Sequence, residues 1–419
     1  MRNPIRTVLI KLPCTVLFVL TAINWVHAQG HADERVLAAA KQCESKERSL
    51  IERLVQIDSG TGDVPGLTAI DTLLRTELEA IGAKVERVAA VAPAQGDNLV
   101  ATLTGTGKGR ILLIAHIDTV FPHGTVAEHP YALVGNHGVG PGAGDDKSGA
   151  ATAVCALSIV QQLHWSDCAQ IKLLLNSNEE TGSVGTRDLI RSLAKQSDAA
   201  INLERGVPPD GVDISRKGSA ILTIEITGRA AHSGLEPEKG RNAAIEAAHQ
   251  ALQPGQLANA EKETTVNVTV LEGGGTINVI PAHATVKADV RAYSNEEFDR
   301  VEEGLRRLSN QTIVPGIEVS ATLARNFPPW PHVASTDALV ERARKLYSEI
   351  GGSLATASVG SSTDVAFAAE TGVPSIDGFG LVGGGAHSLD DYADLASIVP
   401  RVYLLTRMVM DIGEHPPAK

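Results

Sequence analysis

The stretch "ILLIAHIDTV" (residues 111–120) is an apolar run that ends in a histidine and an aspartate two positions apart. Successive aliphatic residues are typical of a strand that is buried on both faces of a sheet. Side chains at positions i and i+2 of a strand point to the same side, so His116 and Asp118 should project together. The pair could simply end the strand, or it could be a metal ligand with the carboxylate that orients it. The second interpretation requires further ligands elsewhere in the chain.

Helical and strand patterns alternate on both sides of this strand. Helices are predicted over residues 33–57, 67–82, 147–163 and 184–195, and strands over 84–90, 97–104, 111–117, 170–176 and 199–203. Such alternation predicts an α/β fold in which helices cover the faces of the sheet.

The pattern changes near residue 217. The segments "SAILTIEITGRA", "ETTVNVTVLEGG" and "HATVKADVRAYS" alternate as strands do, and helices are predicted over 241–253 and 295–309. Two helices on a small, largely antiparallel sheet would form a separate α+β domain. The proline-rich "NFPPWP" (326–331) has the composition of a linker, and helix–strand alternation resumes after it. We therefore expect a small domain inserted into a larger one.

Composition limits the class of protein. The chain has 419 residues, which suits two domains, and its hydrophobic content of 43% with few aromatic residues fits a globular protein with an aliphatic core. The formal net charge of −12 argues against nucleic acid and anionic membranes as partners.

The N-terminus has the pattern of a secretion signal. Basic residues precede the apolar "CTVLFVLTAI", and "VHA" (26–28) supplies small residues at the cleavage positions, so cleavage is predicted after Ala28. A membrane anchor would need a longer apolar run. We therefore expect a signal peptide over residues 1–28 and a periplasmic or secreted mature protein.

Three cysteines remain in the predicted mature chain: Cys43, Cys155 and Cys168. An odd number cannot all pair internally, and Cys155 has the pattern of a small core residue of a helix. We therefore expect no disulfide framework, and whether Cys43 pairs with Cys168 stays open.

Two acidic segments supply candidate partners for His116. "GPGAGDDKSGA" (140–150) is a glycine-rich loop that enters a helix, but Asp146 stands where a phosphate-binding loop needs glycine. Its adjacent carboxylates suit a divalent cation, although a helix-capping aspartate is an alternative. "IKLLLNSNEETGSVG" (171–185) ends an apolar strand in Glu179 and Glu180. A nearby cation would let one bind metal while the other acts as a base; otherwise the pair is an exposed acidic loop.

Two further ligand types also follow predicted strands. "AAINLERG" places Glu204 at a strand end, and "FGLVGGGAHS" places His387 in a glycine-rich loop. Open α/β sheets build their sites at the carboxyl ends of strands. Two histidines and three carboxylates can hold two zinc ions if one carboxylate bridges them. This convergence favours a metal site over five unrelated structural roles.

The motifs together carry a family resemblance. In order, they are "HIDTV", "GPGAGDDKSG", "NEETGSVG", "LERG", "AAHSG", "INVIPA", "DVRAY" and "GGGAHS". The chain resembles the zinc-dependent exopeptidases of the aminoacylase and carboxypeptidase family, and within it the secreted bacterial glutamate carboxypeptidases (carboxypeptidase G type). The resemblance implies a homodimer that cleaves the amide bond before a C-terminal amino acid of peptides or N-acyl amino acids with a free carboxylate. It also implies a zinc-exopeptidase-like catalytic domain over 29–216 and 328–419, with an α+β dimerisation or lid domain over 217–327.

The resemblance further implies a role for each site residue. His116, Asp145 and Glu204 would bind one zinc ion, and Asp145, Glu180 and His387 the other. Asp118 would orient His116, and Glu179 would be the general base. His232, Asn278 and Arg291 of the inserted domain would contact the substrate. A zinc pair lowers the pKa of a shared water to roughly 7, and Glu179 would then move its proton to the leaving nitrogen.

The resemblance has departures around the substrate pocket. Ser361 and Ser362 stand where the family loop has glycines, and Arg205 stands where the glutamate enzymes have proline. A lysine that lines their specificity pocket is also missing here. The preferred C-terminal residue therefore stays open. The alternatives are an N-acyl amino acid deacylase or dipeptidase of the same family, a periplasmic solute-binding protein, and a metal-dependent phosphoesterase.

Overall fold

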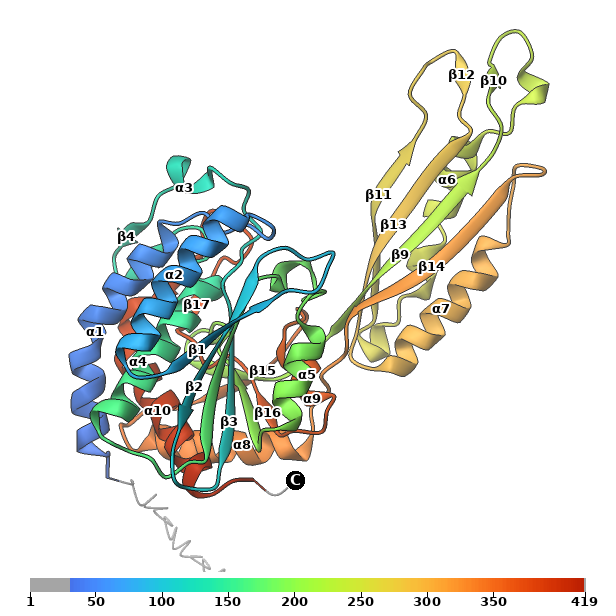
Figure 1. Ribbon diagram of the computed structural model, residues 1–419. Coiled ribbons are helices and arrows are strands. Elements are labelled where there is room, and N and C mark those ends of the chain that lie inside the picture. Colours follow the sequence, from blue (N-terminus) through green and yellow to red (C-terminus); the bar gives the residue numbers. More distant parts are fainter. Residues whose placement is uncertain (1–30, 418–419) are drawn as a thin grey trace, which may run out of the picture.

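The structure is a computed structural model that describes residues 31–417 (Figure 1). Its main unit is built on a six-stranded sheet with the order β1-β2-β6-β3-β7-β16. The strands are β1 (Lys84–Ala89), β2 (Asp97–Thr104), β6 (Gln170–Asn176), β3 (Arg110–His116), β7 (Ala199–Asn202) and β16 (Ser375–Ile376). β3 runs parallel to β6 and β7, whereas β2 runs antiparallel to β1 and β6. The predicted α/β class is confirmed, and the sheet is mixed.

Helices cover both faces of this sheet. One face carries α1 (Glu34–Val55), α2 (Val64–Ala80), α4 (Ser148–Gln162), α8 (Ala334–Ser348) and α10 (Ile398–Glu414), and the other carries α5 (Arg187–Lys195) and α9 (Val365–Ala369). Alternate residues of β3 pack into different cores: Ile111 and Leu113 face the first group of helices, whereas Leu112 and Ile114 face the second. The apolar run of β3 thus buries both sides of a central strand.

Short elements surround the end of the sheet where His116 lies. A four-stranded sheet has the order β17-β18-β5-β4, and β15 pairs with β8 in parallel. The elements are α3 (Thr125–Glu128), β4 (Ala132–Val134), β5 (His137–Val139), β8 (Gly211–Arg216), β15 (Ala355–Val359), β17 (Gly383–Gly384) and β18 (Tyr392–Asp394).

The second unit projects from the main unit (Figure 1). Its antiparallel sheet has the order β11-β13-β9-β14, and helices α6 and α7 pack against it around a core of their own. The elements are β9 (Gly218–Thr227), α6 (Ala243–Ala251), β11 (Thr265–Gly273), β13 (His283–Ala292), α7 (Asn295–Ser309) and β14 (Glu318–Phe327). At its far end, β10 (Ala231–His232) pairs with β12 (Val279–Ile280).

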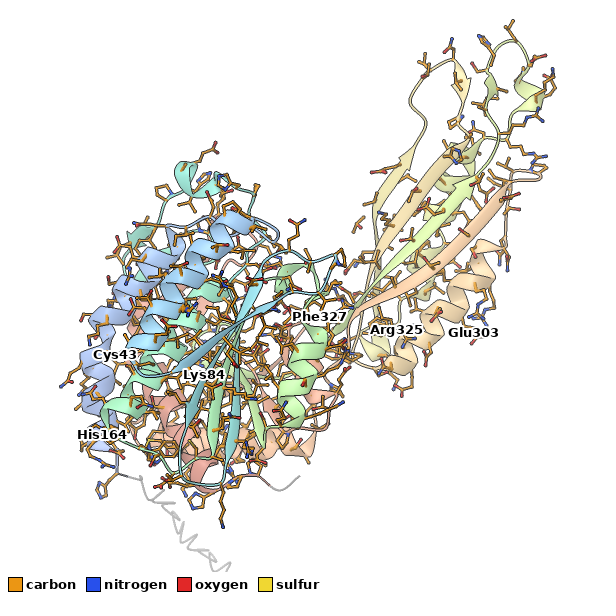
Figure 2. All side chains as sticks on the ribbon, in the orientation of Figure 1. Cys43, Lys84, His164, Glu303, Arg325 and Phe327 are labelled. Carbon is orange, nitrogen blue, oxygen red and sulfur yellow. A yellow bond between two sulfur atoms is a disulfide. The ribbon has the colours of Figure 1, made fainter. Side chains whose placement is uncertain are left out.

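The chain crosses between the units at two adjacent points. Arg216 and Trp330 exchange backbone hydrogen bonds of 2.9 and 3.1 Å, which holds the outgoing and returning segments together. Phe327, the last residue of β14, lies at this junction in Figure 2 and packs against Phe367 of the main unit with ring centroids 5.3 Å apart.

The cysteines correct one expectation. A disulfide bond joins Cys43 of α1 to Cys155 of α4, and Cys168 is the free, buried thiol. The interpretation of Cys155 as a packing residue alone was therefore wrong, and Cys43 does not pair with Cys168. Helices α1 and α4 both place a cysteine on their contact face, which the linear pattern does not reveal. Among residues 31–417, no helix is long and apolar enough to cross a membrane, and the predicted signal peptide lies outside the described residues.

Candidate metal centre and substrate pocket

His116 ends strand β3, and its imidazole is buried at the centre of the candidate site. Its Nε2 lies 3.1 Å from Asp145 Oδ1 and 3.6 Å from Glu204 Oε1. Asp145 lies in the segment Ala143–Lys147 that leads into α4, where its own backbone is not helical (φ −124°, ψ 86°), and Glu204 follows β7. Neighbouring strands of one sheet therefore bring these side chains to a common edge, as the sequence predicted.

Glu180 and His387 complete the cluster on the other side of Asp145. His387 Nε2 lies 3.0 Å from Glu180 Oε2 and 3.7 Å from Asp145 Oδ2. Glu180 lies in a short turn directly after β6, and His387 has a left-handed backbone conformation with φ of 61°. The two oxygens of Asp145 thus face different histidines, which is the arrangement that a bridging carboxylate needs.

The donor set fits a divalent metal ion. Single ligand atoms of His116, Asp145 and Glu180 all lie within 4.8 Å of one another. Burial and the Asp145 carboxylate raise the pKa of Glu204 to about 8. Such a crowded group of buried carboxylates is costly to ionise unless a cation neutralises it. Imidazole nitrogens and carboxylate oxygens are ligands that zinc accepts.

Asp118 connects His116 to the turn that carries the two glutamates. Its Oδ1 is 3.4 Å from His116 Nδ1, and its carbonyl oxygen is 3.1 Å from the same nitrogen. Its carboxylate also accepts hydrogen bonds from the backbone amides of Glu179 (3.0 Å) and Glu180 (3.2 Å), and from the hydroxyl of Thr61 (2.6 Å). Asp118 therefore fixes the ring of His116 relative to both glutamates.

Glu179 has the surroundings of a general base. Its side chain is buried, and burial together with the nearby carboxylates of Asp364, Glu204 and Glu180 raises its pKa well above the usual range. A carboxylate with a raised pKa is a stronger base at neutral pH than a solvated one. Glu179 lines the pocket beside the cluster.

A pocket of about 440 Å³ opens on the cluster. Its lining includes Arg205, Arg216, Arg291 and the loop from Gly360 to Thr363. Arg291 reaches it from β13 of the second unit, and its Nη1 donates a hydrogen bond of 3.1 Å to Ser362 Oγ. The structure therefore brings Arg291 to the site, and its contact with a substrate stays a prediction.

His232 and Asn278 are not in this pocket within one chain. Both are exposed, and they lie together at the far end of the second unit, where β10 pairs with β12 (Figure 1). The backbone amide of Ser233 donates a 3.0 Å hydrogen bond to the Asn278 carbonyl. The long strands of the second unit carry both residues away from the cluster of their own chain, and their predicted contact with the substrate stays a prediction.

Two arginines of the site received no role from the sequence. Arg205 directly follows Glu204, and its Nη1 is 3.2 Å from Asp145 Oδ2. Arg216 is buried between Asp213 and Asp377, each 2.7 Å from its guanidinium group. The sequence offers one signal for each arginine. Arg205 follows the candidate metal ligand Glu204, and Arg216 lies where the chain crosses to the second unit.

Comparisons with known proteins agree with this arrangement. The model of peptidase family M20/M25/M40 matches residues 112–411. Carboxypeptidase G2 of Pseudomonas sp. (strain RS-16) is 36% identical over 366 residues, which cover 87% of this chain and 88% of that protein. Acetylornithine deacetylase of Myxococcus xanthus is 27% identical over 386 residues, covering 86% of this chain and 96% of that protein. The fold is similar to the M20 family metallo-carboxypeptidase Sso-CP2 from Sulfolobus solfataricus, with a TM-score of 0.68, 16% identity, and coverage of 87% of this chain and 98% of that one.

Proposed function

Because this chain belongs to peptidase family M20/M25/M40, and is therefore a hydrolase, we propose that it is a di-zinc carboxypeptidase. It would hydrolyse the amide bond before the C-terminal residue of small peptides or N-acyl amino acids. The observation that carries this proposal is the convergence of five candidate metal ligands beside a pocket that also holds Arg291. Membership of a peptidase family disfavours the solute-binding and phosphoesterase alternatives.

The ligand set divides naturally around Asp145. His116, Asp145 and Glu204 would hold one zinc ion, and Asp145, Glu180 and His387 would hold the second. When bound, such ions polarise a substrate carbonyl and lower the pKa of water. Asp118 would keep His116 in the orientation that coordination requires, because it contacts the ring nitrogen that faces away from Asp145.

Glu179 would carry the proton through the reaction. It would accept a proton from the attacking water as the water oxygen bonds to the carbonyl carbon. The C–N bond then breaks to leave a carboxylate, and the same proton passes to the leaving nitrogen as an amine forms. The raised pKa of Glu179 supports this role, since the group must both take up and release the proton. Arg291 would bind the free carboxylate of the leaving amino acid through paired N–H groups.

An N-acyl amino acid deacylase is the second candidate within the family. The similarity to acetylornithine deacetylase of Myxococcus xanthus favours it, and that relationship covers nearly the whole relative. Both candidates break an amide bond next to an amino acid. The two activities differ only in which half of the substrate the pocket selects.

We further propose that the protein is an exported homodimer. The exposed positions of His232 and Asn278 support the dimer, because a partner's second unit would have to deliver them to the pocket. The N-terminal pattern described above supports export.

A substrate screen with controlled metal content tests the proposed function. N-acetyl amino acids and dipeptides varied at the C-terminal residue should release that residue, and a chelator should abolish the release until zinc is returned. Elemental analysis should find two zinc ions per chain. Full amide hydrolysis by a metal-free preparation would contradict the proposal.

A further inference from the structure

The loop between β15 and α9 places two neighbouring serines against two arginines. Ser362 Oγ lies 2.7 Å from the carbonyl oxygen of Lys217 and 3.1 Å from Arg291 Nη1. Ser361 Oγ lies 2.6 Å from Arg216 Nη1. Both serines line the substrate pocket.

The hydrogen bonds of Ser362 have only one possible direction. A carbonyl oxygen can only accept, so the single hydroxyl proton of Ser362 goes to Lys217. A guanidinium group can only donate, so the oxygen of Ser362 accepts from Arg291. Ser362 thereby links Arg291, which belongs to the second unit, to the loop of the main unit.

Arg291 depends on this link for its orientation. Its Nε faces both carboxylate oxygens of Asp289 at 3.0 Å, and its Nη1 uses one hydrogen on Ser362. The other N–H groups of Nη1 and Nη2 stay available for a substrate carboxylate. The side chain is about a third exposed, so without Ser362 only its neighbour on the same strand would restrain the guanidinium group.

Ser361 has a different role because its arginine is already paired with two carboxylates. Arg216 is held by Asp213 and Asp377, so the hydroxyl oxygen of Ser361 accepts from a rigid, buried cation. The hydroxyl proton of Ser361 makes no hydrogen bond within residues 31–417, and the residue is exposed at the pocket. A donor polarised in this way is suited to an anionic acceptor.

We propose that Ser361 and Ser362 determine the preference for a free substrate carboxylate, Ser362 by positioning Arg291 and Ser361 by donating a hydrogen bond to the substrate. The inference rests on the proposed function, because it assigns this pocket to the leaving amino acid. It concerns the two serines of the loop, Ser361 and Ser362.

The test compares N-acetyl amino acids with their C-terminal carboxamides. Ser362→Ala should raise KM for the free acids roughly five- to tenfold, the effect of one lost hydrogen bond, and leave kcat, carboxamide KM and zinc content unchanged. Ser362→Thr, which keeps the hydroxyl group, should restore binding. In an Arg291→Ala background, Ser362→Ala should have no further effect, since the two residues act as one unit.

Ser361→Ala tests the second half of the proposal, the hydrogen bond from Ser361 to the substrate. It should also weaken free-acid binding, but its effect should persist in the Arg291→Ala background. Ser358→Ala is the matched control: its hydroxyl accepts from Ser215 Oγ at 2.7 Å, outside the pocket, so free-acid preference should not change.

Substrate binding can also be measured when no substrate is cleaved. Calorimetry with the zinc-loaded Glu179→Gln protein gives the same comparison of acids and carboxamides even if no tested amide is cleaved. Absence of turnover with intact acid preference would count against the proposed function alone. Equal losses for acids and carboxamides, or an undiminished Ser362→Ala effect without Arg291, would overturn the inference. If Ser362→Ala does not fold, Ser362→Gly must show the same losses.

Discussion

Glu179 and Glu180 are adjacent in sequence but face different partners. Glu180 Oε2 lies 3.0 Å from His387 Nε2, within the metal cluster, whereas Glu179 is buried beside other carboxylates at the pocket. A residue that only moves protons can be lost without losing the metal. The distinction between these two glutamates can therefore be measured.

We predict that Glu179→Gln keeps both zinc ions and lowers kcat by roughly 10²- to 10⁴-fold, the usual contribution of a general base. Glu180→Gln should instead lose one of the two zinc ions, because Glu180 is a proposed ligand of that ion and not of the other. Elemental analysis of both variants measures the zinc content, and steady-state kinetics measures the loss of kcat. Equal zinc loss from the two variants would argue against this division of roles.

A second buried carboxylate, Glu47 of α1, lies outside the metal cluster. Its only hydrogen bond among the described residues comes from Thr152 Oγ1 at 2.7 Å. Burial raises the pKa of Glu47 from 4.5 to about 8. The folded protein therefore keeps a proton that the unfolded chain releases, and stability falls as pH rises between these two values.

We predict that Glu47→Gln flattens this pH dependence, since the amide cannot ionise but keeps the contact with Thr152. At pH 8 the variant should be more stable than the native protein by roughly a few kcal/mol, and near pH 4.5 the difference should vanish. Urea unfolding across the pH range measures this. The neighbouring Glu44→Gln, at a partly exposed position, serves as control, and an unchanged slope in Glu47→Gln would refute the prediction.

At the scale of elements, the sequence predicted those parts that have a long apolar pattern. Strand β3 and helix α4 bury long apolar runs, so both could be predicted from the pattern of apolar residues. The candidate ligands that follow β3, β6 and β7 could then be placed at one edge of the sheet. Strands β17 and β18 have two and three residues, too few for a period to show. The Cys43–Cys155 bond and the contacts of Arg205, Ser361 and Ser362 depend on tertiary proximity, which no linear spacing contains.

Helix α4 must approach the end of β7 closely for Asp145 to meet Glu204. A Cβ atom at Gly149 would lie 2.2 Å from the Leu203 carbonyl oxygen and 2.1 Å from Asp146 Oδ1, so only glycine permits this contact. We predict that Gly149→Ala moves the first turn of α4, weakens zinc binding at least about tenfold and lowers stability by roughly 1–3 kcal/mol.

Gly255→Ala is the control for this change. Nothing lies within 4 Å of the added Cβ, so its stability should change by less than about 0.5 kcal/mol and zinc affinity should stay the same. Competition with a chromophoric chelator and thermal unfolding give both readouts. Native zinc affinity in Gly149→Ala would show that the close approach is not what positions Asp145.

At the scale of the whole molecule, residues 31–417 form two units that meet near the chain crossings, and the β10–β12 end lies far from the main unit (Figure 1). This shape leaves Arg291 in the pocket but His232 and Asn278 outside it. The sequence motifs of all three residues are similar in kind. Only the three-dimensional arrangement separates Arg291, which reaches the pocket of its own chain, from two residues that do not.

Mixed dimers test whether His232 acts across the dimer that we propose. His232→Ala and Glu179→Gln proteins should each be nearly inactive, because each lacks one necessary group at every site. After unfolding and refolding together, a mixed dimer would contain one site with Glu179 from one chain and His232 from the other. Random pairing in a two-fold dimer should then restore roughly a quarter of the native activity. If His232 served its own chain, mixing would restore nothing, and a fully active monomer in sedimentation would exclude the dimer itself.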